Sequence, residues 1–208
     1  MDLLTPVTTF VALFVVIDPI GLAPIFIALT QGTDAKHRRA VALRAVTIAF
    51  ILLTLFAFFG EAVLGFIGIS MPAFRIAGGI LLFITALDML FERRTKRRED
   101  KAEEHDEEHP DPSVFPLAIP LIAGPGAIAT MILLVGQAPG PIGIASVLGV
   151  MLAVLALVLM LFLLGGIIER ALGRTGINVV TRLLGMLLAA LSVQFVLDGL
   201  RAFGIGAL

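Results

Sequence analysis

Apolar residues fill six long stretches of this chain, and short polar or charged segments separate them. A helix needs about 20 predominantly apolar residues to cross a bilayer, which each stretch provides. The predicted spans are Leu3–Leu29, Ala40–Phe59, Met71–Phe91, Val114–Leu134, Ile142–Ile168 and Asn178–Leu200. The pattern therefore predicts an all-α polytopic membrane protein with six transmembrane helices.

The composition agrees with a membrane protein that has little soluble mass. Hydrophobic residues make up 59% of the 208 positions, and the mean hydropathy is +1.06, whereas soluble domains are about 45 to 50% apolar. The first ten residues contain no lysine or arginine, so we interpret the first stretch as a retained span and not a cleaved signal peptide. There is no cysteine, and a net charge of −1 suggests no nucleic-acid partner.

Basic residues predict the orientation, because cytoplasmic loops are enriched in lysine and arginine. They gather in or beside the first, third and fifth loops: Lys36, Arg38, Arg39, Arg44, the basic run within 93–101, Arg170, Arg174 and Arg182. The second and fourth loops have none, apart from Arg75 at the edge of the third span. We therefore predict a multi-pass protein of the cell (inner) membrane with both termini outside, in the periplasm.

The second half of the chain repeats the first. The pattern E-x-x-L-G-x-x-G-I-[S/N] begins at Glu61 and again at Glu169, a shift of 169 − 61 = 108 positions. Arg75-x-x-Gly78 likewise matches Arg182-x-x-Gly185. A unit of three spans is odd, so the second copy enters the membrane from the opposite side. We predict a first three-helix repeat at 1–91, a charged cytoplasmic linker at 92–113, and a second, inverted three-helix repeat at 114–208.

The first and fourth predicted spans are both broken at mid-membrane by proline and glycine. A carboxyl group inside hydrocarbon costs at least ~2.5 to 3.5 kcal/mol, so it is expected to face protein or a cavity. Interrupted segments at corresponding positions of inverted repeats are typical of the binding sites of secondary transporters. The residues concerned are Asp18, Pro19, Gly21, Pro24, Gly124, Pro125 and Gly126.

A helix that restarts after such a break presents unpaired amides and the positive end of its dipole, which suit a carboxylate. We expect one restart after Pro24 and the other at Gly124, meeting tip to tip around a small polar chamber. Asp18 then supplies the charge for an ammonium group, and Thr130, one helical turn past Gly126, lies close by. Alternatively, the prolines and glycines only kink packed helices, and Asp18 is an N-cap.

Coupling to an ion is open at this stage. A carboxyl shielded from water favours its neutral form, so Asp18 is a candidate proton acceptor. Carbonyl groups freed at the breaks suit sodium equally well. The sequence therefore predicts no cofactor and leaves H+ or Na+ as the possible coupling ion.

Other polar residues in or beside the spans have two interpretations. Arg75 and Arg182 either gate a vestibule or lie at the interface and pair with Glu61 or Glu169. Polar groups within membrane helices more often bond to neighbouring helices than to a ligand. That second group comprises Ser70, Thr85, Gln137, Asn178, Ser192 and Gln194.

The linker holds a match to a zinc-protease pattern, H-x-x-E-H, between His105 and His109. It lies in an acidic segment directly before Pro110, where no rigid helix would align the two imidazoles. We interpret it as a coincidence and predict no metal site. Apart from Asp18, the spans contain no nucleophile, dyad or metal cluster, so an enzyme is not expected.

Three motifs carry a resemblance to a known family. DPIGLAPIF (Asp18–Phe26), RIAGGI from Arg75, and PLAIPLIAGPGAIATMI (Pro116–Ile132) resemble the MarC family of bacterial inner-membrane proteins, over nearly all of the chain. That family is grouped with neutral amino-acid transporters and, more distantly, with LysE-type exporters. This chain departs from the family pattern at Leu22, where a polar residue often follows the first glycine.

The resemblance and the repeat together predict a secondary transporter that moves small neutral amino acids of the glycine and alanine class by alternating access. Its partners would be a small-molecule substrate and the lipid bilayer; the oligomeric state is open. The alternative is a channel or exporter for another small solute.

Overall fold

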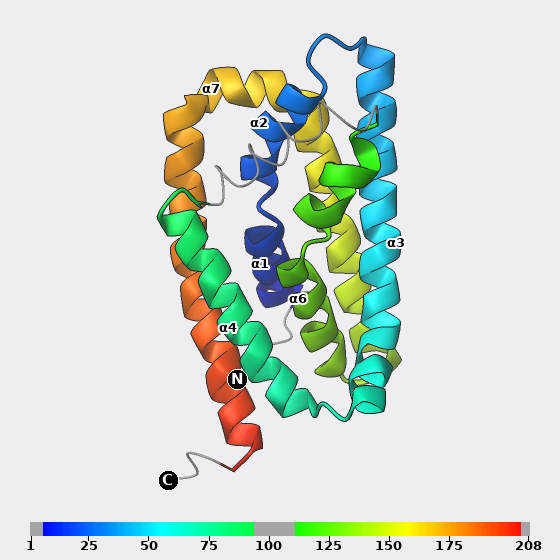
Figure 1. Cartoon of the computed structure of the whole chain (residues 1–208), viewed down its shortest axis with the longest axis vertical. Coiled ribbons are helices and arrows are strands. Elements are labelled where there is room, and N and C mark those ends of the chain that lie inside the picture. The colour runs from blue at the N-terminus through cyan, green and yellow to red at the C-terminus, as the bar shows by residue number, and fades with distance from the viewer. Residues whose placement is uncertain (1–5, 94–110, 205–208) are drawn as a thin grey trace.

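The computed structural model of the chain describes residues 6–93 and 111–204, without the side chains of 166–170 and 174. The regular structure of this described part is helical throughout (Figure 1). The helices are α1 (Pro6–Ile17), α2 (Pro19–Leu29), α3 (Ala35–Ile67), α4 (Met71–Leu90), the irregular helix η1 (Ser113–Ile122), α6 (Pro125–Gly136) and α7 (Gly140–Ala202). An all-α polytopic architecture is thereby confirmed.

Six segments of the described chain are long and apolar enough to cross a membrane. Five are Pro6–Leu29, Ala35–Ile67, Met71–Leu90, Gly140–Gly165 and Thr175–Ala202; η1 and α6 together make the sixth, bent by 56°. Gly140–Gly165 and Thr175–Ala202 both belong to α7, whose backbone is non-helical at Gly173 (φ 60°, ψ 173°). The two segments run in opposite directions (Figure 1).

The connections between the helices lie at two ends of the bundle (Figure 1). At the end where the described chain starts and stops, called the terminal end, α1 begins and both α6 and α7 end. At the opposite end, called the linker end because residues 94–110 follow α4 and precede η1, α2 and α4 end and η1 begins. In each half of the described chain, one broken span is followed by two unbroken ones, and the halves start at opposite ends. A symmetry relation between the halves, and the division at 92–113, stay predictions.

The broken first span is the innermost element of the bundle. Of its most apolar 18 residues, 61% are buried, against 28 to 33% in the other four unbent spans. Figure 1 shows α1 and α2 between α4 and the second segment of α7 on one side and α3, α6 and the first segment of α7 on the other. The remaining spans expose large apolar side chains such as Phe59 and Phe66, as expected of lipid-facing helices. The break therefore lies in protein and not against lipid.

Glycine lets α4 and the second segment of α7 pack backbone to backbone. A methyl group at Gly79 would lie 2.8 Å from the carbonyl oxygen of Ser192 and 3.1 Å from the amide nitrogen of Val196. Small residues permit such close approach between membrane helices. Gly199 of α7 makes a similar approach to the first turns of α4.

We expect Gly79→Ala to destabilise the fold by about 1 to 3 kcal/mol, the usual cost of overpacking a filled interior. The added methyl group meets backbone, which cannot rotate away. Circular dichroism at 222 nm during heating in detergent measures the effect. Gly149→Ala is the matched control, because nothing lies within 4 Å of a methyl group there. Equal unfolding midpoints for the two variants would contradict the prediction.

Candidate functional site

The first span is broken at a single residue, Asp18, which adopts the left-handed conformation (φ 57°, ψ 63°). Its amide still donates to the carbonyl of Phe14 at 2.9 Å, and its own carbonyl accepts from the Leu22 amide at 3.1 Å. Hydrogen bonds thus continue across the break. Few residues other than glycine occupy this region of backbone space, although aspartate and asparagine tolerate it.

The position of this break corrects the sequence prediction. We expected α2 to restart after Pro24, but α2 begins at Pro19 and contains Pro24. The reason is that proline suits the first position of a helix, where its missing N–H has no intrahelical partner to lose. The Asp18 carboxylate accepts a hydrogen bond from the Gly21 amide at 3.2 Å, so Asp18 caps α2.

The Asp18 side chain is fully buried and lies close against Gly21. A methyl group at Gly21 would lie 2.2 Å from Oδ2 and 2.9 Å from Cγ of Asp18. Glycine at this position therefore makes room for the carboxylate over the first turn of α2.

The fourth span is broken at Ala123 and Gly124, between η1 and α6. Helix α6 begins at Pro125, and Gly124 at its N-cap provides no side-chain hydrogen bond. The first-turn amides of a helix have no intrahelical acceptor, and they carry the positive end of the dipole. The second restart therefore lies at the motif that the sequence indicates. Pro125 itself is exposed, while Gly124 and Gly126 are half-buried.

The two breaks lie next to each other. A methyl group at Gly126 would lie 3.3 Å from Cγ1 of Val16 and 3.4 Å from Cδ2 of Leu82. Val16 precedes Asp18 by two residues, in the last turn of α1. The N-terminus of α6 therefore abuts the end of α1, and α4 contributes Leu82 to the same place.

Two threonine hydroxyl groups belong to this region. Thr130, which is fully buried, donates to the carbonyl of Gly126 at 2.8 Å. Thr85 donates to the carbonyl of Leu81 at 2.9 Å, and its oxygen would lie 3.9 Å from a methyl group on Gly126. Because each hydroxyl proton is used within its own helix, the oxygens can only accept hydrogen bonds from a ligand. The sequence analysis missed Thr85 as a neighbour of this region.

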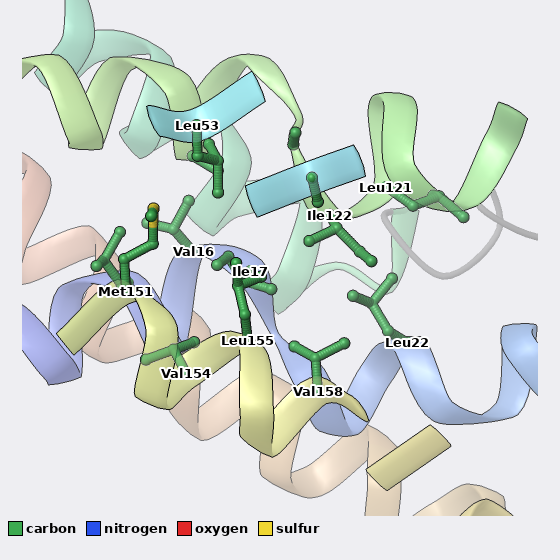
Figure 2. Close-up of a cluster of buried hydrophobic side chains, with 14 of the residues drawn as sticks. Val16, Ile17, Leu22, Leu53, Leu121, Ile122, Met151, Val154, Leu155 and Val158 are labelled. Atoms are coloured by element: carbon green, nitrogen blue, oxygen red, sulfur yellow. The ribbon is translucent and has the colours of Figure 1, made fainter. Parts of the chain in front are cut away.

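Apolar side chains fill the space in which we expected a small polar chamber. Figure 2 shows a buried cluster to which both broken spans contribute. Its labelled members are Val16, Ile17, Leu22, Leu53, Leu121, Ile122, Met151, Val154, Leu155 and Val158. The hydrophobic pattern alone does not say which apolar faces close over a break.

A small cavity lies nearer the terminal end of the bundle. Its volume of about 10 Å³ is close to the minimum that holds one water molecule. The polar part of its lining comes from Thr8 of α1, Gln137 at the end of α6, and Gln194 of α7. The Nε2 atom of Gln137 is buried and has no hydrogen-bond partner.

Comparison with known proteins places the chain in a family. A family model described as "MarC family integral membrane protein" matches residues 4–203. The chain belongs to the MarC family. The resemblance seen in the sequence motifs is thereby confirmed.

Curated MarC relatives resemble the chain over most of their length. They include the UPF0056 membrane protein YvbG of Bacillus subtilis (39% identical over 94% of this chain and 93% of the relative) and the UPF0056 inner membrane protein YhgN of Escherichia coli K12 (34%, 94% and 95%). A UPF0056 membrane protein of Archaeoglobus fulgidus is 38% identical, over 92% and 90%. No solved structure matches the chain.

The charged residues at the ends of the spans differ in the partners that they bind. Arg182 donates to Oε1 of Glu92 at 2.6 Å, a partner that the sequence analysis did not name. Within the described residues, no ion pair joins Arg75 to Glu61, and Glu61 is exposed on α3. The side chain of Glu169 lies outside the described part. Whether these residues gate access stays a prediction.

A second ion pair joins Arg44 of α3 to Asp111, just before η1. The Ser113 amide donates to Oδ1 of Asp111 at 3.0 Å. Burial raises the pKa of the Asp111 carboxyl, but the hydrogen bonds from Ser113 and the charge and hydrogen bond of Arg44 outweigh it, so the pKa is lowered.

The zinc-protease pattern cannot be placed, because His105 and His109 lie outside the described residues. In 6–93 and 111–204, no group of three or more potential metal-ligating side chains comes together. The sequence analysis did not single out Glu92, and it named Thr85, Gln137 and Gln194 without placing them at a break or a cavity. The sequence signal was only their polarity in or beside an apolar span, which does not identify a partner on another helix.

Proposed function

We propose that this MarC protein is a secondary transporter, and not an enzyme, for small neutral amino acids of the glycine and alanine class. The observation that carries the proposal is the N-terminus of α6, which has no side-chain cap and abuts the last turn of α1 at Val16, two residues before the buried Asp18. A zwitterion needs an anion site and a cation site a few ångströms apart. Helix amides suit the substrate carboxylate, and Asp18 suits its ammonium group.

The surroundings of the two breaks support a small substrate. The hydroxyl oxygens of Thr85 and Thr130 are further acceptors for an ammonium group. Val16 and Leu82 lie in van der Waals range of a single methyl group placed at Gly126. A bulky side chain would have to displace them, so glycine and alanine fit this region better than leucine or phenylalanine.

Transport would require a conformational change, because apolar side chains cover the breaks (Figure 2). We propose alternating access, in which the halves 1–91 and 114–208 move against each other, as inverted repeats commonly do. The basic residues beside the linker end support placing that end in the cytoplasm and both termini in the periplasm.

The coupling ion would bind at the same breaks. Asp18 would accept a proton, or Na+ would bind the carbonyl groups that proline leaves without a helical donor. Pro19 offers no N–H to Val15, and Pro24 offers none to Ile20. Imposing a pH gradient or a sodium gradient on proteoliposomes separates the two ions, since only the coupled one accelerates uptake.

Counterflow in proteoliposomes tests the proposed function. We expect vesicles preloaded with unlabelled glycine or alanine to accumulate labelled glycine transiently, and excess leucine to compete poorly. An alternating carrier shows this acceleration by internal substrate, whereas an open channel does not. Protein-free vesicles and proteoliposomes preloaded with glutamate are the controls. Uptake no faster than in protein-free vesicles would overturn the proposal, and uptake that internal glycine or alanine does not accelerate would favour the channel.

A further inference from the structure

Among the described residues, two ion pairs cross between the halves of the chain, and their acidic members flank residues 94–110. Glu92 directly follows α4 of the first half, and it accepts hydrogen bonds from Arg182 at 2.6 Å and Asn178 at 3.4 Å, both in α7 of the second half. Asp111 directly precedes η1 of the second half, and it pairs with Arg44 in α3 of the first half. Arg44 of the first half therefore binds an acidic residue next to the second half, and Arg182 of the second half binds an acidic residue next to the first half.

The local backbone orients both carboxylates toward these partners. Glu92 adopts the left-handed conformation (φ 58°), which is uncommon for a non-glycine residue and suggests a functional constraint. The chain thus turns at the end of α4 and brings the carboxylate to α7. At Asp111, the Ser113 amide holds one carboxylate oxygen while Arg44 binds the other.

Both ion pairs lie at the linker end of the bundle, where α4 ends and η1 begins (Figure 1). The cavity lined by Thr8, Gln137 and Gln194 lies toward the opposite, terminal end. Both ion pairs thus join the halves at the linker end, whereas near the terminal end the halves meet through close packing, such as that of Gly199 in α7 against the first turns of α4.

We propose that Arg44–Asp111 and Glu92–Arg182 form a clasp that holds the two halves closed at the linker end and opens in each transport cycle. The inference rests on the proposed function, because only an alternating carrier needs the halves to separate. Rocking one half against the other stretches both pairs at once. Neither pair contributes to the candidate substrate region at the two breaks.

The strength of the pairs suits a gate. The side chains of Arg44 and Asp111 are 52% and 39% exposed, and those of Arg182 and Glu92 are 52% and 40% exposed. Pairs as exposed as these shift an equilibrium by up to about fivefold. Two of them bias the carrier toward closure without preventing opening.

Side-specific cysteine labelling tests the clasp without knowledge of the substrate. The chain contains no cysteine, so Gln137→Cys provides a single reporter at the cavity. A membrane-impermeant maleimide is applied from the side on which the termini lie. We expect Arg44→Asp or Asp111→Arg to slow labelling by about twofold to fivefold, because opening the linker end closes the terminal end. The double exchange Arg44→Asp/Asp111→Arg should restore the rate.

Neutral variants and a matched control complete the test. Glu92→Gln should slow labelling as the first single variants do, and it serves where a charge reversal fails to fold. Arg201→Gln removes an ion pair of 3.5 Å to Asp198 that lies within α7 alone, and it should leave labelling unchanged. A labelling rate that stays at the wild-type value in the clasp variants, or that falls equally in Arg201→Gln, overturns the clasp.

The labelling result and the transport result separate the two proposals. If labelling shifts but no amino acid is transported, the clasp stands and the substrate assignment fails. If glycine counterflow occurs and labelling does not shift, the function stands and the clasp fails. If single variants slow labelling and the charge exchange does not restore it, the pairing of Arg44 with Asp111 is overturned.

Discussion

Asp18→Asn is expected to lower glycine uptake at least tenfold while the protein stays folded. Asparagine caps a helix about as well as aspartate does, so the hydrogen bond to the Gly21 amide and the start of α2 are retained. What is lost is the negative charge for the substrate ammonium group. Tenfold corresponds to about 1.4 kcal/mol of binding free energy. Initial rates of labelled glycine uptake in proteoliposomes measure the effect.

A second N-cap provides the control for this substitution. Asp34 caps α3 by accepting from the His37 amide at 2.6 Å, at an exposed position. Asp34→Asn makes the same chemical change in the same type of hydrogen bond, away from both breaks. We expect it to transport like the wild type. Uptake by Asp18→Asn at the wild-type rate would remove the carboxylate from the mechanism.

Gly21→Ala is expected to reduce uptake as strongly, although it leaves every charge in place. The new methyl group would lie 2.2 Å from Oδ2 of Asp18, so the buried carboxylate has to turn away from α2. It would then lose the hydrogen bond from the Gly21 amide and the position that this bond gives it. We expect at least a tenfold loss of uptake. The lost cap should also cost about 1 kcal/mol of stability.

Gly65→Ala is the control for the added methyl group, because nothing lies within 4 Å of it on α3. This variant should transport like the wild type and unfold at the same temperature or slightly higher, since alanine favours helix. The pair of variants also separates two roles of Asp18. If Gly21→Ala lowers stability but leaves uptake unchanged, the carboxylate is a cap and not a substrate ligand.

The six spans and the two breaks follow from local patterns, which is why the sequence predicts them well. Twenty apolar residues specify a crossing, and an aspartate or a Gly-Pro-Gly run within one specifies an interruption. These signals reside in a few consecutive residues around Asp18 and Gly124. Packing against the rest of the chain only refines them.

Contacts between distant segments are less predictable from the same patterns. Pro24 looks like a helix break from sequence, yet it lies inside α2, which Asp18 caps and which begins at Pro19. The partner of Arg182 is Glu92, which is 90 positions away and belongs to no repeat motif. The filling of the breaks by Leu121, Ile122 and Val158 (Figure 2) depends on how three elements meet.

The uncharged part of α3 has a length close to the thickness of the hydrocarbon layer of a bilayer. Its 33 residues extend about 50 Å at 1.5 Å per residue, well beyond a hydrocarbon layer of about 30 Å. Between Arg44 and Glu61 it bears no charge, and those 61 − 44 = 17 steps measure about 26 Å. Arg44 thus lies at the depth where the hydrocarbon layer ends and the hydrated head groups begin. When Asp111 separates from Arg44 there, its carboxylate is solvated by water and is not exposed to hydrocarbon.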